Sequence, residues 1–162
     1  MADKKKFLEI NDLVVEYYSD GKTVHAVNGV SLQLEHGKTL GLVGETGAGK
    51  TTIAKSILRI LPDMQAKITN GSVELDGQNL LDLPEKEMIH VRGNKISMIF
   101  QDPMASLNPR KTVGDIIAEG LDIHHTCNSR DERHQMVSDI LRKVGLSPEH
   151  SSRYPHQFSG GM

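Results

Sequence analysis

The sequence predicts an α/β fold in which a strand-rich part, residues 1–100, is followed by a mainly helical part, residues 101–162. Strand-like apolar runs, interrupted by two helical stretches, fill the first part, and amphipathic helical patterns follow Gln101. A glycine-rich segment, Gly44 to Thr52, separates an apolar run from a helix-periodic run. This order is typical of sheets that bind ligands at the carboxyl ends of their strands.

Three strands are predicted at the start of the chain. The first runs from Leu8 to Tyr18 and ends at the turn Ser19-Asp20-Gly21, and the second runs from about His25 to Leu34. The third, Thr39 to Val43, is a continuous apolar run, which predicts a strand buried on both faces.

A helix is predicted to begin near Lys50. Its apolar residues recur at helical spacing, and Pro62 is expected to stop it. They are Ile53, Ile57, Leu58 and Leu61. Beyond this helix the sequence predicts a strand or hairpin arm over Gly71 to Gly77, a short helix over Glu85 to Val91 and a strand over Lys95 to Phe100.

Two amphipathic helices are predicted after the turns Asp102-Pro103 and Asn108-Pro109. They cover roughly Val113 to Leu121 and Arg130 to Val144, each with charges opposite an apolar face. The residues expected to be buried are Ile116, Ile117 and Leu121 in the first helix, and Met136, Ile140 and Leu141 in the second.

Composition limits the possible functions. The chain has 162 residues, 25% of them charged and 37% hydrophobic, and a net charge of −2. No basic face is evident, so no nucleic-acid partner is expected. No run approaches the roughly 18 to 20 apolar residues that span a bilayer, and acids follow Lys4-Lys5-Lys6, so a cytosolic location is expected. Cys127 is the only cysteine, and a zinc site with His124 and His125 would lack two ligands, so these residues are expected at the surface.

The segment Gly44-Glu45-Thr46-Gly47-Ala48-Gly49-Lys50-Thr51-Thr52 fits the pattern G-x-x-x-x-G-K-[ST]. Its glycines allow a tight turn whose backbone N–H groups can surround phosphates. Lys50 supplies a mobile positive charge, and Thr51 supplies an oxygen ligand for Mg²⁺. The helix that comes next adds the positive end of its dipole to the same place. These features together predict a polyphosphate-binding loop.

Two weaker candidates lie further along the chain. Gln101 ends a predicted strand, where its amide oxygen could coordinate Mg²⁺ or position a water, although a polar residue at a strand end is commonplace. Ser159-Gly160-Gly161 is suited to a helix N-terminus that receives an anion, but the tripeptide alone is common.

In this order the motifs resemble those of the ATP-binding subunit of ABC transporters. Gly44 to Thr52 resembles Walker A, Phe100-Gln101 the Q-loop, and Phe158-Ser159-Gly160-Gly161-Met162 the signature motif. The resemblance is closer to the oligopeptide and dipeptide importer branch, and nickel importers look similar. It rests on Phe100 to Pro109, Thr112-Val113-Gly114 and Tyr154-Pro155-His156.

The resemblance implies a P-loop NTPase (RecA-like) core with antiparallel β strands at the N-terminus and an inserted helical subdomain. It implies ATP and Mg²⁺ as ligands, catalytic roles for Lys50 and Gln101, and Mg²⁺ coordination by Thr51 and Gln101. Tyr17 matches the aromatic residue that stacks on adenine; Tyr18 competes for that role, and core packing is the alternative for Tyr17. Ser159, Gly160 and Gly161 are expected to contact the nucleotide of a partner subunit.

The resemblance also implies partners and a location. They are a second ATPase subunit, as a homodimer or heterodimer, two membrane-spanning permease subunits and, indirectly, an extracytoplasmic peptide-binding protein. The subunit is then cytoplasmic and peripheral on the inner face of the cell membrane, where it couples ATP hydrolysis to peptide import.

The sequence departs from the family in one respect. A Walker B strand, four apolar residues followed by Asp-Glu, is missing: Val73-Glu74-Leu75-Asp76 contains a charge, and Leu80-Leu81-Asp82 is too short. The later switch histidine is also missing. We therefore expect an incomplete domain, the amino-terminal portion of a longer subunit, which does not hydrolyse ATP and self-associates or is poorly stable.

Two other kinds of protein could carry such a loop. A P-loop GTPase or nucleotide kinase is disfavoured, because Asp76-Gly77-Gln78-Asn79 does not match D-x-x-G and Asn94-Lys95-Ile96-Ser97 does not match N-K-x-D. A non-catalytic nucleotide-binding or regulatory module stays open on the sequence alone.

Overall fold

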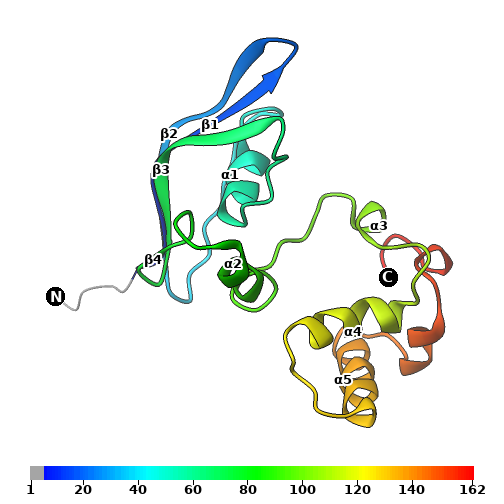
Figure 1. Cartoon of the computed structure of the whole chain (residues 1–162). Coiled ribbons are helices and arrows are strands. Elements are labelled where there is room, and N and C mark those ends of the chain that lie inside the picture. Colours follow the sequence, from blue (N-terminus) through cyan, green and yellow to red (C-terminus); the bar gives the residue numbers. More distant parts are fainter. Residues whose placement is uncertain (1–5) are drawn as a thin grey trace. The chain divides into compact units, whose positions relative to one another are not determined.

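The computed structural model describes residues 6–162 and divides into two compact units, the first ending at Arg92 and the second beginning at Gly93. The first unit is a sheet with two helices beside it, and the second is helical (Figure 1). The predicted α/β class is confirmed.

An antiparallel sheet of strand order β2-β1-β3-β4 forms the first unit. Its strands are β1 (Lys6–Ser19), β2 (Lys22–Glu35), β3 (Ala66–Leu75) and β4 (Gln78–Asn79). The two long strands predicted at the start of the chain are confirmed, as is the turn between them, where Asp20 and Gly21 adopt positive φ. The strand predicted over residues 71–77 is present in part: β3 begins earlier, at Ala66, and ends at Leu75, before a turn in which Asp76 and Gly77 have positive φ.

A β-bulge interrupts the alternation of β1. Asp12 has a φ of 48°, and the pairing with both neighbouring strands shifts register between Ile10 and Val14. Because of this shift, Ile10 and Leu13, three residues apart, are both fully buried. Gly71 permits it: a Cβ there would lie 2.6 Å from the carbonyl oxygens of Asn11 and Asp12.

Helices α1 (Lys50–Ile57) and α2 (Glu85–Val91) lie on one side of this sheet (Figure 1). Ile53 and Leu58 of the α1 region and Met88 of α2 are buried there. Helix α2 has the predicted bounds. Helix α1 ends earlier than the predicted stop at Pro62, because Arg59 takes a left-handed φ of 52° and turns the chain.

The strand predicted over Thr39 to Val43 is wrong. These residues pair with no strand among residues 6–162 and lie at the surface, with Val43 94% exposed. A parallel strand buried on both faces requires a neighbour on each side, and the described residues supply none.

The second unit packs α4 (Val113–Ile123) against α5 (Arg130–Lys143). A short helix, α3 (Pro103–Ser106), precedes them, and two 3₁₀ turns follow, η1 (Pro148–Ser152) and η2 (Pro155–Gln157). Helices α4 and α5 are capped at their N-termini by Thr112 and Ser129, whose side chains accept hydrogen bonds from Asp115 N–H and Glu132 N–H.

The core of this unit differs in part from the predicted one. Ala118, Val137 and Leu141 are buried at its centre, with Val113, Ile117, Leu121 and Leu146 against them. Leu141, Ile117 and Leu121 were predicted. Ile116, Met136 and Ile140 are only half-buried, because the contact face turns toward Ala118 and Val137.

The strand predicted over Lys95 to Phe100 is also wrong. Apart from a single bridge at Ile96, these residues form no strand, and Ile99 is 90% exposed. Gln101 therefore follows an extended surface segment instead of closing a strand, and it is exposed.

Candidate nucleotide-binding site

The glycine-rich loop lies in the first unit, directly before α1. Residues 44–48 are exposed, and Gly47 and Gly49 have φ values of 86° and 81°. The Lys50 ammonium folds back over the loop and donates hydrogen bonds to the carbonyl oxygens of Gly44 and Glu45, each at 2.6 Å. An ammonium has three N–H donors, so one remains for an anion.

Gly49 fixes this loop against the sheet. A Cβ at Gly49 would lie 2.3 Å from the carbonyl oxygen of Ala26 in β2, closer than real Cβ contacts come. Only glycine therefore combines this left-handed φ with this approach to β2. The start of α1 is held against the strand that carries Val27, which is buried.

The N-terminal end of α1 is open toward solvent. Its N-cap is Gly49, which has no side chain to cap it, and the first turn contains no acidic residue. The N–H groups of a first helical turn have no partner within the helix, and they carry the positive end of its dipole. Thr51, the second residue of α1, is exposed.

The residues present fit a Mg²⁺-bound polyphosphate. The glycines leave space that a Cβ would fill, the free N–H groups and Lys50 supply donors, and the Thr51 hydroxyl is an oxygen ligand beside them. This set of N–H donors, one ammonium and one hydroxyl oxygen therefore suits an anion accompanied by its metal cation.

The two candidate tyrosines lie on opposite faces of β1. Tyr17 is half-buried, pairs with Val24 and Ala66 on the flanking strands, and shares its face with the buried Val15. Tyr18 is 41% exposed, and its hydroxyl donates to the Glu16 carboxylate at 2.7 Å. This hydrogen bond raises the pKa of the Tyr18 phenol. Of the two tyrosines, Tyr17 therefore lies on the sheet face that contains Val27, and the Val27 side chain lies beside Gly49.

The remaining predicted site residues belong to the second unit. Gln101 precedes α3, and Ser159, Gly160 and Gly161 form an exposed turn in which Met162 N–H donates to Ser159 O at 2.9 Å. Phe158, just before that turn, packs edge-on against His150, with ring centroids 5.6 Å apart.

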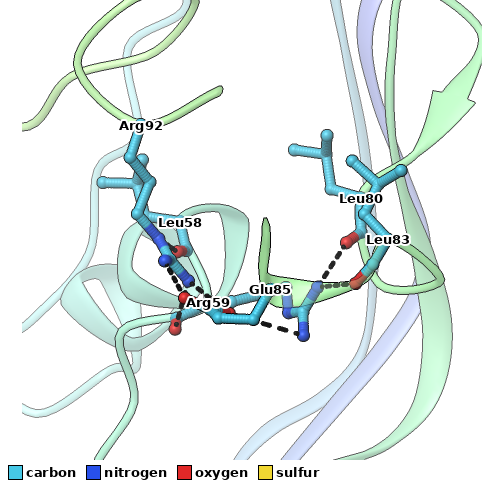
Figure 2. A network of polar contacts seen from close by, with 6 residues as sticks. All are labelled: Leu58, Arg59, Leu80, Leu83, Glu85 and Arg92. Carbon is cyan, nitrogen blue, oxygen red and sulfur yellow. Dashed lines mark hydrogen bonds and ion pairs between the residues drawn. The ribbon is translucent and has the colours of Figure 1, made fainter. Parts of the chain in front are cut away.

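A polar network that the sequence reasoning missed holds the other end of α1 (Figure 2). Arg92 donates to the carbonyl oxygens of Leu58, at 2.7 Å, and Arg59, at 3.2 Å, and pairs with Glu85. Arg59 donates to the carbonyl oxygens of Leu80 and Leu83. The available signal was Glu85 at the start of a predicted helix and Arg92, seven residues on, at its end, which places both on one face.

The positive charges of this network change the pKa of the Glu85 carboxyl. The hydrogen bond from Arg92, with the nearby positive charges of Arg92 and Arg59, lowers the pKa of the Glu85 carboxyl against a smaller opposing effect of burial. Glu85 therefore favours its charged form in the folded protein, and any stability it contributes is lost as the pH falls through this lowered pKa.

Within residues 6–162, no three His, Cys, Asp or Glu side chains are grouped so that they could hold a metal ion. Cys127 is half-buried, as is His124, while His125 is exposed. None of the helices in this part of the chain is long and apolar enough to cross a membrane.

A comparison with protein-family models matches residues 27–162 to the ABC transporter family. The match includes the loop, α1 and the whole second unit. The chain belongs to the ABC transporter family.

Curated relatives are similar over nearly the whole chain. The oligopeptide transport ATP-binding protein OppF of Bacillus subtilis is 46% identical over 158 residues, which are 98% of this chain and 50% of that protein. OppF of Escherichia coli is 47% identical over 162 residues, 100% of this chain and 47% of that protein. The dipeptide transport ATP-binding protein DppF of Lactococcus lactis is 43% identical over 163 residues, 100% of this chain and 51% of that protein. The chain thus spans about half the length of these relatives.

Solved structures share the fold. An ATP-binding cassette determined as a dimer bound to ADP and Pi superposes with a TM-score of 0.81 at 24% identity, over 95% of this chain and 64% of that one. The protein cbiO1 of Clostridium perfringens, described as part of the ABC transporter complex cbiONQ, gives a TM-score of 0.70 at 22% identity, over 97% of this chain and 57% of that one. At these identities the likeness shows the fold alone.

Proposed function

We propose that this chain is the nucleotide-binding part of the ATP-binding subunit of a peptide importer. The observation that carries the proposal is the loop Gly44 to Thr52, with its left-handed glycines, its folded-back lysine and an uncapped helix behind it. The relatives named above for oligopeptide and dipeptide transport support the peptide cargo.

In the proposed site, each group has a defined part. The N–H groups of the loop and of the first turn of α1 hold the β- and γ-phosphates, and Lys50 neutralises their charge. Thr51 and Gln101 are the ligands proposed for Mg²⁺, the ion that neutralises charge between phosphates when bound. Tyr17 stacks on the adenine.

The proposal extends to the assembled transporter. Two such subunits pair, and Ser159, Gly160 and Gly161 of one contact the nucleotide held by the loop of the other. ATP then favours the closed pair, and transport follows from its higher affinity for that state. Two permease subunits and an extracytoplasmic peptide-binding protein complete the machine, with this subunit peripheral on the inner face of the membrane.

The 162 residues alone are proposed to bind ATP without hydrolysing it. Phosphoryl transfer requires a metal, a group that orients water and a clamp on the phosphates together. The sequence provides the clamp but no apolar strand followed by Asp-Glu. Metal-dependent steady-state turnover by these residues, abolished by Lys50→Ala, would refute this part.

A titration with Mg-ATP tests the proposed function. Lys50→Ala removes a charged donor from the phosphates and is expected to weaken binding roughly 10- to 100-fold. Lys55→Ala is the matched control, because Lys55 lies in the last turn of the same helix. Equal affinities in the wild type and Lys50→Ala, or no binding by the wild type, would contradict the proposal.

A further inference from the structure

At the C-terminal end of α1, the Arg92 side chain hydrogen-bonds the last backbone carbonyls. The backbone N–H groups of Arg59 and Ile60 satisfy the carbonyls of Ser56 and Lys55, and Arg59 then turns the chain with its positive φ. The carbonyls that follow, those of Leu58 and Arg59, accept from the Arg92 guanidinium instead. A positive group at this position also complements the negative end of the helix dipole.

Arg92 reaches this position from a second helix. Its own N–H donates to Met88 O at 2.9 Å, so its backbone ends α2. One edge of its guanidinium faces the carbonyls at the end of α1, and its Nη1 faces Glu85 at the start of α2 (Figure 2). The planar fork of arginine makes both sets of contacts at once, which the single ammonium of lysine cannot do.

Arg59 and Glu85 extend the contact to a third segment. Arg59 donates to carbonyls of residues 80–83, the connection between β4 and α2, and its Nη2 lies 3.9 Å from Glu85 Oε2. Leu80 in that connection is 1% exposed, so the connection is fixed in the core. We call these three side chains, Arg59, Glu85 and Arg92, the Arg92 clasp.

The clasp and the phosphate loop hold opposite ends of the same short helix. Helix α1 has eight residues, about 12 Å of rise, so its two ends are joined by only about two turns of hydrogen-bonded backbone. At its first end Gly49 meets β2, and at its second end the clasp joins it to α2 and to residues 80–83. A shift at the second end therefore changes the direction of the N–H donors at the first.

We propose that Arg92 is a positioning residue for nucleotide binding, which acts through α1 to aim the phosphate-binding N–H groups of residues 49–52. This rests on the proposed function, and it assigns a role in the site to residues that do not touch the nucleotide. Glu85 orients Arg92, and Arg59 ties the same helix end to the connection before α2.

Inorganic tripolyphosphate with Mg²⁺ is the decisive probe, because it has no base and reports on the phosphate donors alone. Arg92→Lys keeps the charge but breaks the fork, and it is expected to weaken tripolyphosphate binding roughly tenfold or more, since small displacements of positioned groups are costly. Glu85→Gln is expected to weaken it in the same direction, by less. If Arg92→Lys does not fold, Glu85→Gln is judged by the same criteria.

Two controls separate positioning from general stability. Val73→Ala removes methyl groups from a fully buried residue of β3 and is expected to destabilise the first unit while leaving all three side chains of the clasp in place. Arg133→Lys breaks a comparable arginine–carboxylate fork, the one with Asp122 in the second unit. Both are expected to bind tripolyphosphate as the wild type does, at a temperature where every variant is folded.

The possible results are distinct. Weaker binding by the clasp variants alone supports the inference. Unchanged binding by Arg92→Lys, or an equal loss in Val73→Ala of matched stability, overturns it and leaves the proposed function intact. Absence of binding in the wild type overturns the proposed function itself, and the inference with it.

Discussion

Single glycines decide the geometry of the glycine-rich loop before α1, and two of them differ in what they require. Gly47 and Gly49 have nearly the same left-handed φ. A Cβ at Gly47 would meet no atom of residues 6–162 within 4 Å, whereas one at Gly49 would meet the Ala26 carbonyl oxygen at 2.3 Å. The first position therefore requires glycine for its conformation alone, and the second also for its contact with β2.

Substitution by alanine should separate the two requirements. Gly47→Ala is expected to cost about 1 kcal/mol of unfolding free energy, the usual penalty of a left-handed residue with a Cβ. Gly49→Ala is expected to cost roughly 3 kcal/mol or more, because β2 and α1 must also move apart. Denaturant unfolding of both variants measures this; equal costs would show that the approach to Ala26 is unimportant.

At the scale of elements, local patterns were sufficient where the element is held by local contacts. The hairpin of β1 and β2, and helices α2, α4 and α5, follow from alternation, turn residues and helical periodicity. The turn of the glycine-rich loop before α1 was also predictable, because it depends on residues that are consecutive in the sequence. Residues 39–43 and 95–100 are apolar enough for strands, but a strand needs partners, and none lies within the described chain.

Other features depend on tertiary contacts that a linear pattern does not contain. The early end of α1 follows from the left-handed Arg59, and the bulge at Asp12 shifts which residues of β1 are buried. The Arg92 clasp joins residues 33 and 34 positions apart, so neither arginine stands out in the sequence. In the second unit, Ala118 and Val137 form the centre because a small residue lets α4 and α5 approach.

At the scale of the whole molecule, the exposed apolar segment before the loop is the main feature. Leu40 and Leu42 are about half exposed and Val43 almost fully, in a segment that joins no sheet. Exposed apolar residues with unpaired backbone groups favour association between chains. We expect the 162-residue chain to self-associate through residues 39–43.

A charge in this segment should reduce that association. Val43→Lys is expected to shift the sedimentation profile toward monomer at a given concentration. Val144→Lys, at a residue 66% exposed at the end of α5, is the matched control and should leave the profile unchanged. A wild-type chain that sediments as a monodisperse monomer, or an equal effect of both variants, would contradict this expectation.

The central claim is that backbone N–H groups of the loop and of the start of α1 receive the phosphates of ATP. Amide chemical shifts recorded during a titration with Mg-ATP test it most directly. The account predicts that the largest changes fall on residues 47–52, and that Lys50→Ala reduces them at equal nucleotide concentration. Unchanged amides at residues 47–52, together with saturable changes elsewhere in the chain, would contradict it.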